Sequence, residues 1–234
     1  MIGTLYLVAT PIGNLEDITF RAIRVLREAD LVACEDTRQT LKLLNKYDLR
    51  KSLISFYEYR EKQRIPRLLD LLQSGKSVAL VTDAGTPGVS DPGFRLVREA
   101  VRLQIPVVPV PGPAAVIAAL AASGLPTHRF LFMGFAPPKR EALRKTLLSI
   151  REEEGTVIFY LPARKIELFL ETLPADFADR LVVIAREMTK IHEEFLRGTP
   201  AGLLEIAKRR EFKGEVTILI HGAGRREAGS DRSG

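Results

Sequence analysis

The stretch Val81-Thr-Asp-Ala-Gly-Thr-Pro-Gly-Val-Ser-Asp-Pro-Gly93 interrupts a regular pattern of strands and helices. The apolar residues 77–81 before it are typical of a buried strand, and a helical pattern resumes at Phe94. Permissive backbone at the end of a strand can present main-chain amides to a ligand. Ligands of open α/β sheets bind at that edge. The alternative is an ordinary strand-to-helix turn, for which one glycine and one cap would suffice.

Strand and helix patterns alternate along the first half of the chain. The expected strands cover residues 3–9, 31–34, 53–56, 77–81 and 107–110, and the expected helices cover residues 19–28, 37–47, 61–74 and 94–103. Short apolar strands that alternate with helices are typical of a parallel sheet covered on both faces. The first half therefore predicts an α/β domain with a mostly parallel sheet flanked by helices.

The second half predicts another α/β domain, with a mixed sheet. Its expected strands cover residues 130–134, 156–161, 180–186, 193–197 and 215–221, and its expected helices cover residues 114–123, 139–153, 166–172 and 201–210. The short connection between the strands near Ala185 and Phe195 indicates a hairpin. We place the boundary at Pro111-Gly-Pro113, which gives domains 1–111 and 112–223, and expect a disordered basic tail over 224–234.

Composition restricts the class of protein. With 46% hydrophobic and 27% charged residues, the chain is typical of a globular protein, and no apolar run reaches the roughly 18 residues of a membrane span. The amino terminus has no secretory signal pattern. The single cysteine, Cys34, cannot form an internal disulfide, so we expect a cytoplasmic protein. The net charge of +6 is compatible with a polyanionic partner such as RNA.

Four loops follow the expected strands of the first domain, and we number them in chain order. Loop 1 covers residues 9–17, loop 2 covers 34–38, loop 3 covers 81–93 and loop 4 covers 110–113. Loop 2 places Glu35, Asp36 and Arg38 directly after a strand, either as charges that complement a helix dipole or as the rim of a catalytic cleft. In loop 3, Asp91 precedes a proline and is expected to cap the following helix.

Several common sites are absent from the sequence. The three histidines, His128, His192 and His221, lie far apart and have no cysteine partners, so we expect no metal site. A nucleophile elbow, a GxxxxGK phosphate loop and a GxGxxG dinucleotide motif after the first strand are also missing. These absences exclude the commonest nucleotide-binding α/β folds.

The loops, in this order, resemble those of the tetrapyrrole methylase family, which uses S-adenosylmethionine (SAM). The resemblance covers roughly residues 3–223, through Leu7-Val-Ala-Thr-Pro-Ile-Gly-Asn14, Ala84-Gly-Thr-Pro87, Pro111-Gly-Pro-Ala-Ala115, Phe132-Met-Gly-Phe135, Ile184-Ala-Arg-Glu-Met-Thr189 and Gly214-Glu-Val-Thr-Ile-Leu-Ile220. It implies two α/β domains with bent SAM in a cleft between them.

Three motifs indicate one group within that family. Thr10-Pro-Ile-Gly-Asn-Leu-Glu-Asp-Ile-Thr19, Glu35-Asp-Thr-Arg38 and Asp83-Ala-Gly-Thr-Pro87 are similar to those of members that methylate the ribose 2′-oxygen of a cytidine in 16S ribosomal RNA, in the decoding centre of the small subunit. Thr86 stands where the broader family often has aspartate. Many relatives in this group extend further at the carboxyl end, so we expect an RNA contact made there to be absent or to come from elsewhere.

The resemblance implies the residues of the SAM site. Those expected to enclose SAM are Pro11, Asp83, Gly85, Pro87, Ala114 and Ala115 in the first half, and Leu161, Arg186 and Glu187 in the second. A ribose hydroxyl is a weak nucleophile, so its position and the removal of its proton should both matter. We assign Asp36 or Glu35 as base or orienting group, and Arg38 as the residue that holds a phosphate.

Two sets of residues are candidates to contact RNA. Lys139, Arg140, Arg144 and Lys145 form a basic stripe that is either an RNA contact or a solvated helix face. Tyr57, Tyr59 and Tyr160 are candidates to stack on a splayed cytidine, or to pack in the core. Family members are commonly homodimers, and we expect the same here.

Two other functions remain open at this point. One is carbon methylation of a tetrapyrrole with the same methyl donor. The other is a non-catalytic RNA-binding role in ribosome assembly, which basic charge would suit but which does not need four glycine- and proline-rich loops. A knotted methylase fold is disfavoured because its binding loops would cluster near the carboxyl terminus.

Overall fold

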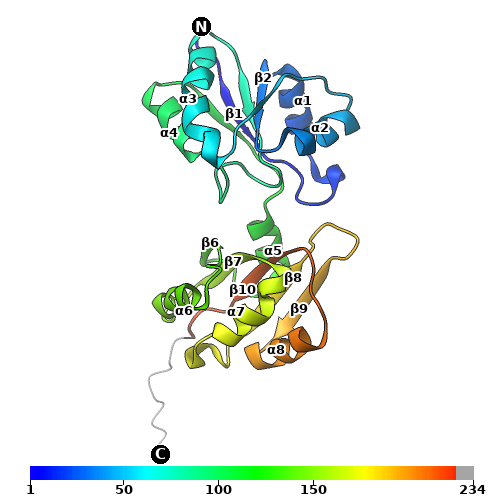
Figure 1. Ribbon diagram of the computed structural model, residues 1–234, viewed down its shortest axis with the longest axis vertical. Coiled ribbons are helices and arrows are strands. Elements are labelled where there is room, and N and C mark those ends of the chain that lie inside the picture. The colour runs from blue at the N-terminus through cyan, green and yellow to red at the C-terminus, as the bar shows by residue number, and fades with distance from the viewer. Residues whose placement is uncertain (225–234) are drawn as a thin grey trace, which may run out of the picture. The chain divides into compact units, whose positions relative to one another are not determined.

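The computed structural model of the chain describes residues 1–224, the side chain of Glu58 excepted (Figure 1). Its internal contacts divide it into a first unit, Met1–Ala115, and a second unit that begins at Val116. The tail expected to be disordered falls, from residue 225 onward, outside the described residues. Each unit has its own sheet and its own hydrophobic core.

The first unit is built on a five-stranded sheet in which all the strands are parallel, as predicted. Its strand order is β3-β2-β4-β1-β5. The strands are β1 (Leu5–Val8), β2 (Leu31–Cys34), β3 (Leu53–Ser55), β4 (Val78–Leu80) and β5 (Val107–Val110). The strands are short, and the inner strands β2 and β4 are almost fully buried, because helices cover both faces of the sheet.

Two helices cover each face of this sheet. On one face lie α1 (Phe20–Glu28) and α2 (Thr37–Lys46), which pack on Val8, Val32 and Val81; a short 3-10 turn, Leu15–Asp17, precedes α1. On the other face lie α3 (Glu58–Gln73) and α4 (Phe94–Arg102), which pack on Leu5 and Leu80. Figure 1 shows the two pairs on opposite sides of the strands.

The order of the strands creates a switch point at the centre of the sheet. From β1 the chain passes through α1 to β2, and from the neighbouring β4 it passes through α4 to β5 in the opposite direction. Right-handed crossovers in opposite directions place their helices on opposite faces, so the loops after β1 and β4 diverge. Ligands of such sheets bind in the crevice between the diverging loops. Here these are loops 1 and 3.

The second unit has a mixed five-stranded sheet of order β6-β7-β10-β8-β9. The strands are β6 (Phe130–Phe135), β7 (Thr156–Pro162), β8 (Val182–Arg186), β9 (Glu194–Gly198) and β10 (Glu215–Ile220). The predicted hairpin is confirmed, since β8 and β9 are antiparallel with Ala185 opposite Phe195. Only the pair β6 and β7 is parallel within the sheet that the structure describes.

The helices of the second unit are α5 (Ala115–Ser123), α6 (Arg140–Ser149), α7 (Ile166–Thr172) and α8 (Pro200–Arg209), with 3-10 turns at Ala163–Lys165 and Ala175–Phe177. Helices α6, α7 and α8 contribute to one core with the sheet, around Phe159, Phe169 and Phe177. Helix α5 is attached to the sheet by hydrogen bonds: the Tyr160 hydroxyl accepts from the Val116 amide at 3.0 Å, and Arg197 donates to the Ser123 carbonyl at 3.0 Å.

One local prediction about helix ends is wrong. Asp91 does not cap α4; the residue at the N-cap is Gly93, whose φ of 136° is open to glycine but strained for other residues. The Gly93 amide instead donates to the buried carboxylate of Glu61, from α3, at 3.3 Å. A partner more than thirty residues away in sequence supplies the cap, so local sequence gave no sign of it.

Candidate functional site

Loops 1 and 3 are joined where the central strands end. Thr10 and Gly85 exchange two backbone hydrogen bonds of 2.9 Å, which form an isolated antiparallel bridge. The hydroxyl of Thr10 also donates to the Thr82 carbonyl at 2.9 Å. Thr10 is buried, so these bonds are shielded from water. The bridge holds the two diverging loops together at the switch point.

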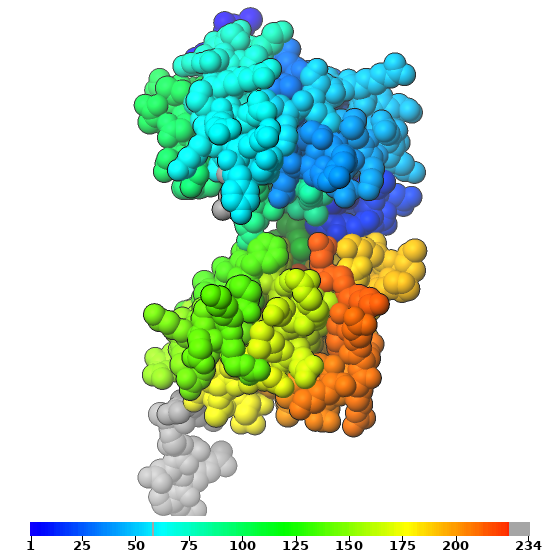
Figure 2. All heavy atoms as spheres, in the orientation of Figure 1, coloured from blue at the N-terminus to red at the C-terminus, as the bar shows by residue number. Residues whose placement is uncertain are grey.

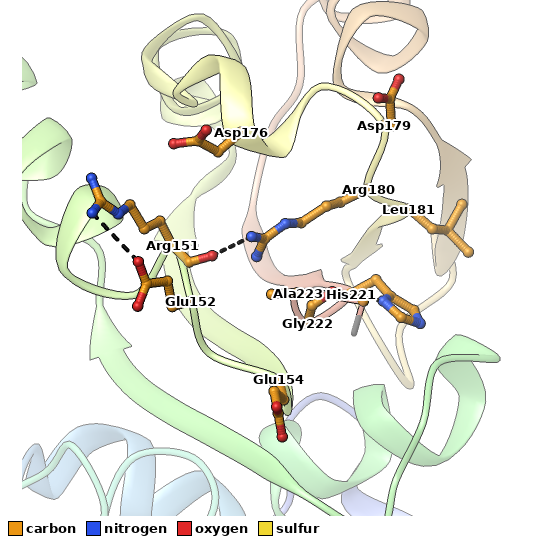
Figure 3. A pocket seen from close by; sticks show the side chains of 11 residues that line it. Arg151, Glu152, Glu154, Asp176, Asp179, Arg180, Leu181, His221, Gly222 and Ala223 are labelled. Carbon is orange, nitrogen blue, oxygen red and sulfur yellow. Dashed lines mark hydrogen bonds and ion pairs between the residues drawn. The ribbon is translucent and has the colours of Figure 1, made fainter. Parts of the chain in front are cut away.

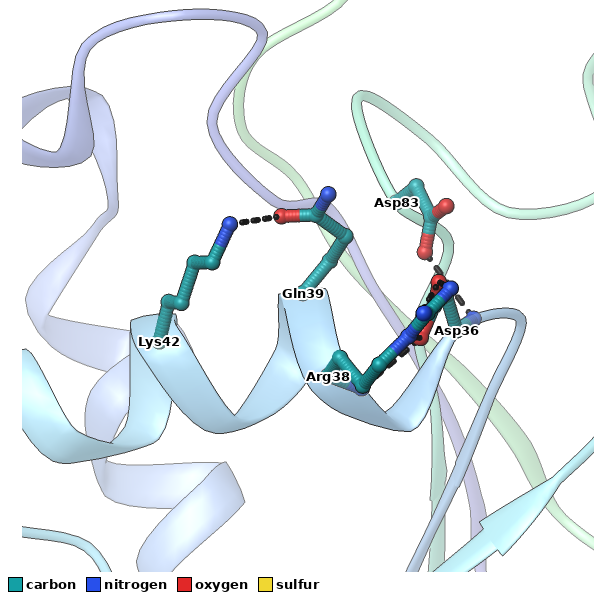
Figure 4. A network of polar contacts seen from close by, with 5 residues as sticks. All are labelled: Asp36, Arg38, Gln39, Lys42 and Asp83. Atoms are coloured by element: carbon teal, nitrogen blue, oxygen red, sulfur yellow. Dashed lines mark hydrogen bonds and ion pairs between the residues drawn. The ribbon is translucent and has the colours of Figure 1, made fainter.

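Loop 2 is anchored by its own charged residues (Figure 4). The Asp36 carboxylate caps α2 by accepting from the Arg38 amide at 2.8 Å, and it forms an ion pair with the Arg38 guanidinium at 2.7 Å. The Asp36 amide donates to the Asp83 carboxylate at 3.0 Å, which connects loop 2 to loop 3. Asp36 thus lies at the amino end of α2, as the helix-dipole alternative expected, and its side chain also caps the helix.

Loop 3 contains an unusual amount of left-handed backbone. Gly85, Gly88, Ser90 and Gly93 all have positive φ. A glycine adopts this conformation freely, whereas for Ser90 it costs energy that the surrounding structure must supply. Such strain is concentrated at ligand and catalytic sites. The position of Ser90, directly before Asp91, makes this end of the loop a candidate for function.

Three carboxyl groups at this edge have raised pKa values. Burial raises the pKa of Glu35, and the neighbouring Asp83 raises it further. Partial burial raises the pKa of Asp83, which also faces Asp36. Burial, together with the charge of Glu35, raises the pKa of Asp91 to about 6. Groups whose pKa lies near neutrality are suited to proton transfer.

Thr82, which is buried at the end of β4, connects two of these carboxyl groups. Its hydroxyl donates to a carboxylate oxygen of Glu35 at 3.4 Å, and its interaction with Asp91 lowers the pKa of that carboxyl, against the larger effect of burial. A hydroxyl has one proton to donate. Because that one proton can be donated to only one carboxylate at a time, Thr82 stabilises the ionised form of either Glu35 or Asp91.

Asp36 has the opposite character. Its hydrogen bonds with the Arg38 side chain and amide lower the pKa of its carboxyl to about 2. An aspartate with so low a pKa is a weak base. Of the two residues that the sequence suggested as base, the structure therefore favours Glu35 over Asp36. It adds Asp91, which the sequence had indicated as a helix cap.

The other residues expected around SAM in the first unit lie in or next to the same loops. Pro11, Gly85 and Pro87 are buried, so their contacts with a ligand would come mainly from main-chain atoms. Loop 4 is connected to loop 3 because the Thr86 hydroxyl donates to the Pro113 carbonyl at 3.3 Å. Ala114 and Ala115 follow directly and are half-buried. All four loops thus belong to one edge of the first sheet.

The three residues expected from the second unit lie near one end of its sheet. Leu161 is buried in the core of that unit, next to Val216 on β10. Arg186 contacts the Glu194 carboxylate at 3.3 Å and the Lys213 carbonyl at 3.2 Å. These contacts hold the arginine in place.

Glu187 has strained backbone, with a φ of 49°. Burial would raise the pKa of its carboxyl, but hydrogen bonds from the Glu215 amide and from Lys190 lower it overall. A fixed carboxylate on strained backbone is a feature of binding sites. Glu187 and Arg186 are adjacent at the end of β8, and both are already held by neighbours within this unit.

The aromatic candidates differ in their surroundings. Tyr160 packs edge-on against Phe132 at 4.8 Å and Phe135 at 5.6 Å, which is a structural role. Tyr57 is half-buried, whereas Tyr59, in the first turn of α3, is 88% exposed. Only the pair Tyr57 and Tyr59 lies at the edge of the sheet that carries the carboxyl groups.

A cavity of the second unit lies away from these residues (Figure 3). It has a volume of about 1020 Å³ and lies in the second unit, where β7 and β8 begin and β10 ends. Leu161 and Arg186 lie at the opposite end of the same strands. Arg180, which lines the cavity, stacks on Phe177 at 4.1 Å and donates to the Arg151 carbonyl. The cavity is therefore separate from the residues expected around SAM.

Two further findings concern metals and membranes. Within residues 1–224, histidine, cysteine, aspartate and glutamate side chains form no group of three or more that could hold a metal ion. The helices of this part of the chain are too short or too polar to cross a lipid bilayer.

Comparison with known sequences indicates a family and a group within it. The family described as "Tetrapyrrole (Corrin/Porphyrin) Methylases" matches residues 4–203. A protein of Halalkalibacterium halodurans named "Ribosomal RNA small subunit methyltransferase I" is 47% identical over 222 residues, which are 95% of this chain and 77% of that protein. A protein of Thermotoga maritima with the same name is 45% identical over 221 residues, which are 94% of this chain and 99% of that protein.

Comparison with solved structures supports the predicted fold. The crystal structure of diphthine synthase superimposes with a TM-score of 0.71 and 18% identity, over 94% of this chain and 90% of that one. At this identity the likeness concerns the fold alone. The prediction of two α/β domains with a parallel and a mixed sheet is confirmed.

Proposed function

Because the chain belongs to the tetrapyrrole methylase family, and is therefore a methyltransferase that uses SAM, we propose that it methylates the ribose 2′-oxygen of a cytidine in 16S ribosomal RNA. The observation that carries this proposal is the identity of 45–47%, over nearly the whole chain, to proteins named as small-subunit ribosomal RNA methyltransferases. In a bacterial cell this substrate lies in the cytoplasm, which is where we expect the protein to act.

The charge at the edge of the first sheet fits SAM. The donor carries a cationic ammonium and a cationic sulfonium group, and Glu35, Asp83 and Asp91 make this edge negative. Bound SAM supplies an electrophilic methyl group. We propose that Pro11, Gly85, Pro87, Ala114 and Ala115 contact it through main-chain atoms and that the exposed Asp83 accepts a hydrogen bond from one of its polar groups. Leu161, Arg186 and Glu187 of the second unit remain predictions.

In the proposed reaction the ribose 2′-oxygen forms a bond to the methyl carbon while the carbon–sulfur bond breaks. The hydroxyl proton must leave the oxygen, and we propose that it passes to Glu35 or Asp91, the two carboxyl groups beside Thr82. A base with a raised pKa holds the incoming proton more strongly than an ordinary carboxylate does. General-base assistance of this kind contributes roughly 10² to 10⁴ in rate.

Asp36 and Arg38 then have a supporting role. Asp36 caps α2 and, through its amide, fixes Asp83. The Arg38 side chain is 85% exposed, and a guanidinium can bind a phosphate with two parallel hydrogen bonds, so Arg38 remains a candidate to hold a phosphate next to the reacting ribose. To do so it would have to exchange its contacts with Asp36.

The substrate assay separates the proposed function from its rivals. Labelled SAM is incubated with small ribosomal subunits that lack the modification and, separately, with uroporphyrinogen. We expect label in the 16S RNA, and mass spectrometry of digested RNA should place one methyl group on a cytidine ribose. Label in uroporphyrinogen alone would indicate tetrapyrrole methylation. Subunit binding with no SAM binding by calorimetry would indicate a non-catalytic assembly protein.

The oligomeric state is a separate proposal. The second unit exposes Ile117, on α5, and Phe130 and Phe135, on β6, and aromatic side chains are enriched at protein–protein interfaces. We propose that a second copy of the chain covers them, as expected for a member of this family. Size-exclusion chromatography with light scattering should give twice the monomer mass of 26.0 kDa. A monomer at micromolar concentration would contradict the proposal.

A further inference from the structure

We propose that α3 binds the RNA. Arg60, Arg64 and Arg67 contact the phosphate backbone, and Tyr59 stacks on an unpaired base. This inference rests on the proposed function, because it assigns the surface on which the RNA substrate would lie. The two substrates have opposite charges. The carboxyl groups at the sheet edge attract a cationic donor but repel phosphates, so an RNA substrate needs cations nearby.

Three arginines form a stripe along α3. Arg60, Arg64 and Arg67 follow one another at spacings of four and three residues, which places them on one side of the helix. At 1.5 Å per residue the stripe spans roughly 10 Å. Figure 2 shows α3, in cyan, at the surface of the first unit. The stripe is therefore available to an extended polyanion.

The arginines of the stripe are not neutralised by carboxylates in the described structure. Among the side chains that are described, none of the three has an ion-pair partner. Glu61, on the same helix, is buried and bonded to the Gly93 amide, and its second oxygen lies 3.7 Å from Arg95 of α4. Its negative charge is thus directed to α4 rather than to the stripe.

The aromatic residues lie at the end of the stripe nearest to the carboxyl groups. Tyr57 follows β3 at the edge where Glu35 follows β2, since Ser55 pairs with Cys34 and the Phe56 amide donates to the Cys34 carbonyl at 2.7 Å. The Tyr57 and Tyr59 rings meet edge-on at 6.5 Å, and Arg60 lies over Tyr57 at 5.8 Å.

Exposed aromatic rings beside arginines are typical of surfaces that bind unpaired nucleotides. A nucleotide inside folded RNA must be splayed out before an enzyme can reach its ribose. Tyr59 presents a free ring for the base of such a nucleotide, or of its neighbour. The stripe would then hold the flanking backbone while the ribose reaches the carboxyl groups.

The test compares three variants of equal charge loss. The first is Arg60→Gln/Arg64→Gln/Arg67→Gln on α3. The matched control is Arg21→Gln/Arg24→Gln/Arg27→Gln on α1, which covers the opposite face of the sheet. The third is Lys139→Gln/Arg144→Gln/Lys145→Gln, from the basic stripe that the sequence suggested. Binding to unmodified small ribosomal subunits is measured against salt concentration, and SAM binding is measured by calorimetry.

We expect the α3 variant alone to lose RNA affinity, with unchanged SAM affinity. Each lost phosphate contact should reduce the slope of log K against log salt by about 0.7 to 0.9. For three contacts the slope should fall by about 2 to 3. If the α1 and α3 variants lost equal RNA affinity, net charge alone would explain the loss, and the inference would be overturned. A loss confined to the third variant would place the RNA on the second unit and overturn it as well.

Tyr59 is tested by two substitutions. Stacking on one base is worth roughly 1 to 3 kcal/mol, so Tyr59→Ala should raise KM for subunits about 5- to 150-fold, while Tyr59→Phe keeps the ring and should change it little. Equal effects of the two substitutions would overturn stacking. If the wild-type protein binds subunits through α3 but transfers no methyl group to them, the proposed function fails while the RNA surface stands.

Discussion

Replacing Asp91 with asparagine should make the protein more stable at neutral pH, although it removes a residue of the candidate site. In the folded state the pKa of Asp91 is raised from its ordinary value of 3.8 to about 6 by burial, with a further contribution from Glu35. A raised pKa means that the folded protein binds the proton more tightly than the unfolded chain does. The stability that this provides is present below pH 4 and is lost as pH rises through 6.

The size of the effect follows from the shift. One pKa unit corresponds to 1.36 kcal/mol, so a rise of about two units gives about 3 kcal/mol at pH 7. Solvent reaches the half-buried carboxyl and screens it, which reduces the expected value to about 2 kcal/mol. Asparagine does not titrate. The free energy of unfolding of Asp91→Asn should therefore exceed that of the wild type by an amount that grows by about 2 kcal/mol between pH 4 and pH 7.

Urea denaturation at a series of pH values measures this difference directly. A difference in the free energy of unfolding that is the same at every pH would report only how asparagine fits beside Thr82. The informative quantity is therefore the change of that difference with pH. Asp70→Asn, an exposed position on α3, serves as control. A difference that stays flat from pH 4 to pH 7 would falsify the claim that Asp91 is held in a raised-pKa environment. The same variant should transfer methyl groups more slowly, because sites trade stability for activity.

Three further predictions concern the same fold. Gly93→Ala should destabilise the protein by about 1 to 3 kcal/mol in thermal unfolding, because φ is 136° and a Cβ would lie 2.8 Å from a methyl group of Leu80. Thr82→Val should raise the pKa of Asp91, because the Thr82 hydroxyl lowers that pKa in the wild type. The pH at which the single-turnover rate rises should therefore move upward. An unmoved profile would show that Thr82 does not set the pKa of the base. Phe159→Ala should cost about 3 to 5 kcal/mol in denaturant unfolding, because this ring is fully buried in the core of the second unit; less than 1 kcal/mol would contradict that packing.

The regular elements were largely predictable from the sequence. Strand β2 covers residues 31–34 and α7 covers residues 166–172, as expected from apolar periodicity. Periodicity is a local property, and a strand buried on both faces shows it as a continuous apolar run. Helix α3 begins three residues earlier than the expected residue 61, because its start depends on Tyr57 at the end of β3 and not on a capping side chain.

The position and pKa of the Asp91 carboxyl could not be predicted from the residues next to it in sequence. The sequence Ser90-Asp-Pro92 favours a helix cap, and nothing near it indicates Glu61, which supplies the cap from α3. Asp91, which is not the cap, lies beside Thr82, at the end of β4, and Glu35, at the end of β2. Its pKa depends on burial and on charges brought together by strand order, which single-sequence patterns do not encode.

The sequence by itself determined the class of fold, the four loops at strand ends and, through its motifs, the family. These follow from local rules, because hydrophobic period, glycine and proline act within a few residues. Only the tertiary structure decided which loops meet. The order β3-β2-β4-β1-β5 places β1 beside β4, which joins Thr10 to Gly85 across some seventy-five residues of chain. It also decided which carboxyl groups have raised pKa values, because burial and neighbouring charges depend on contacts in space and not in sequence.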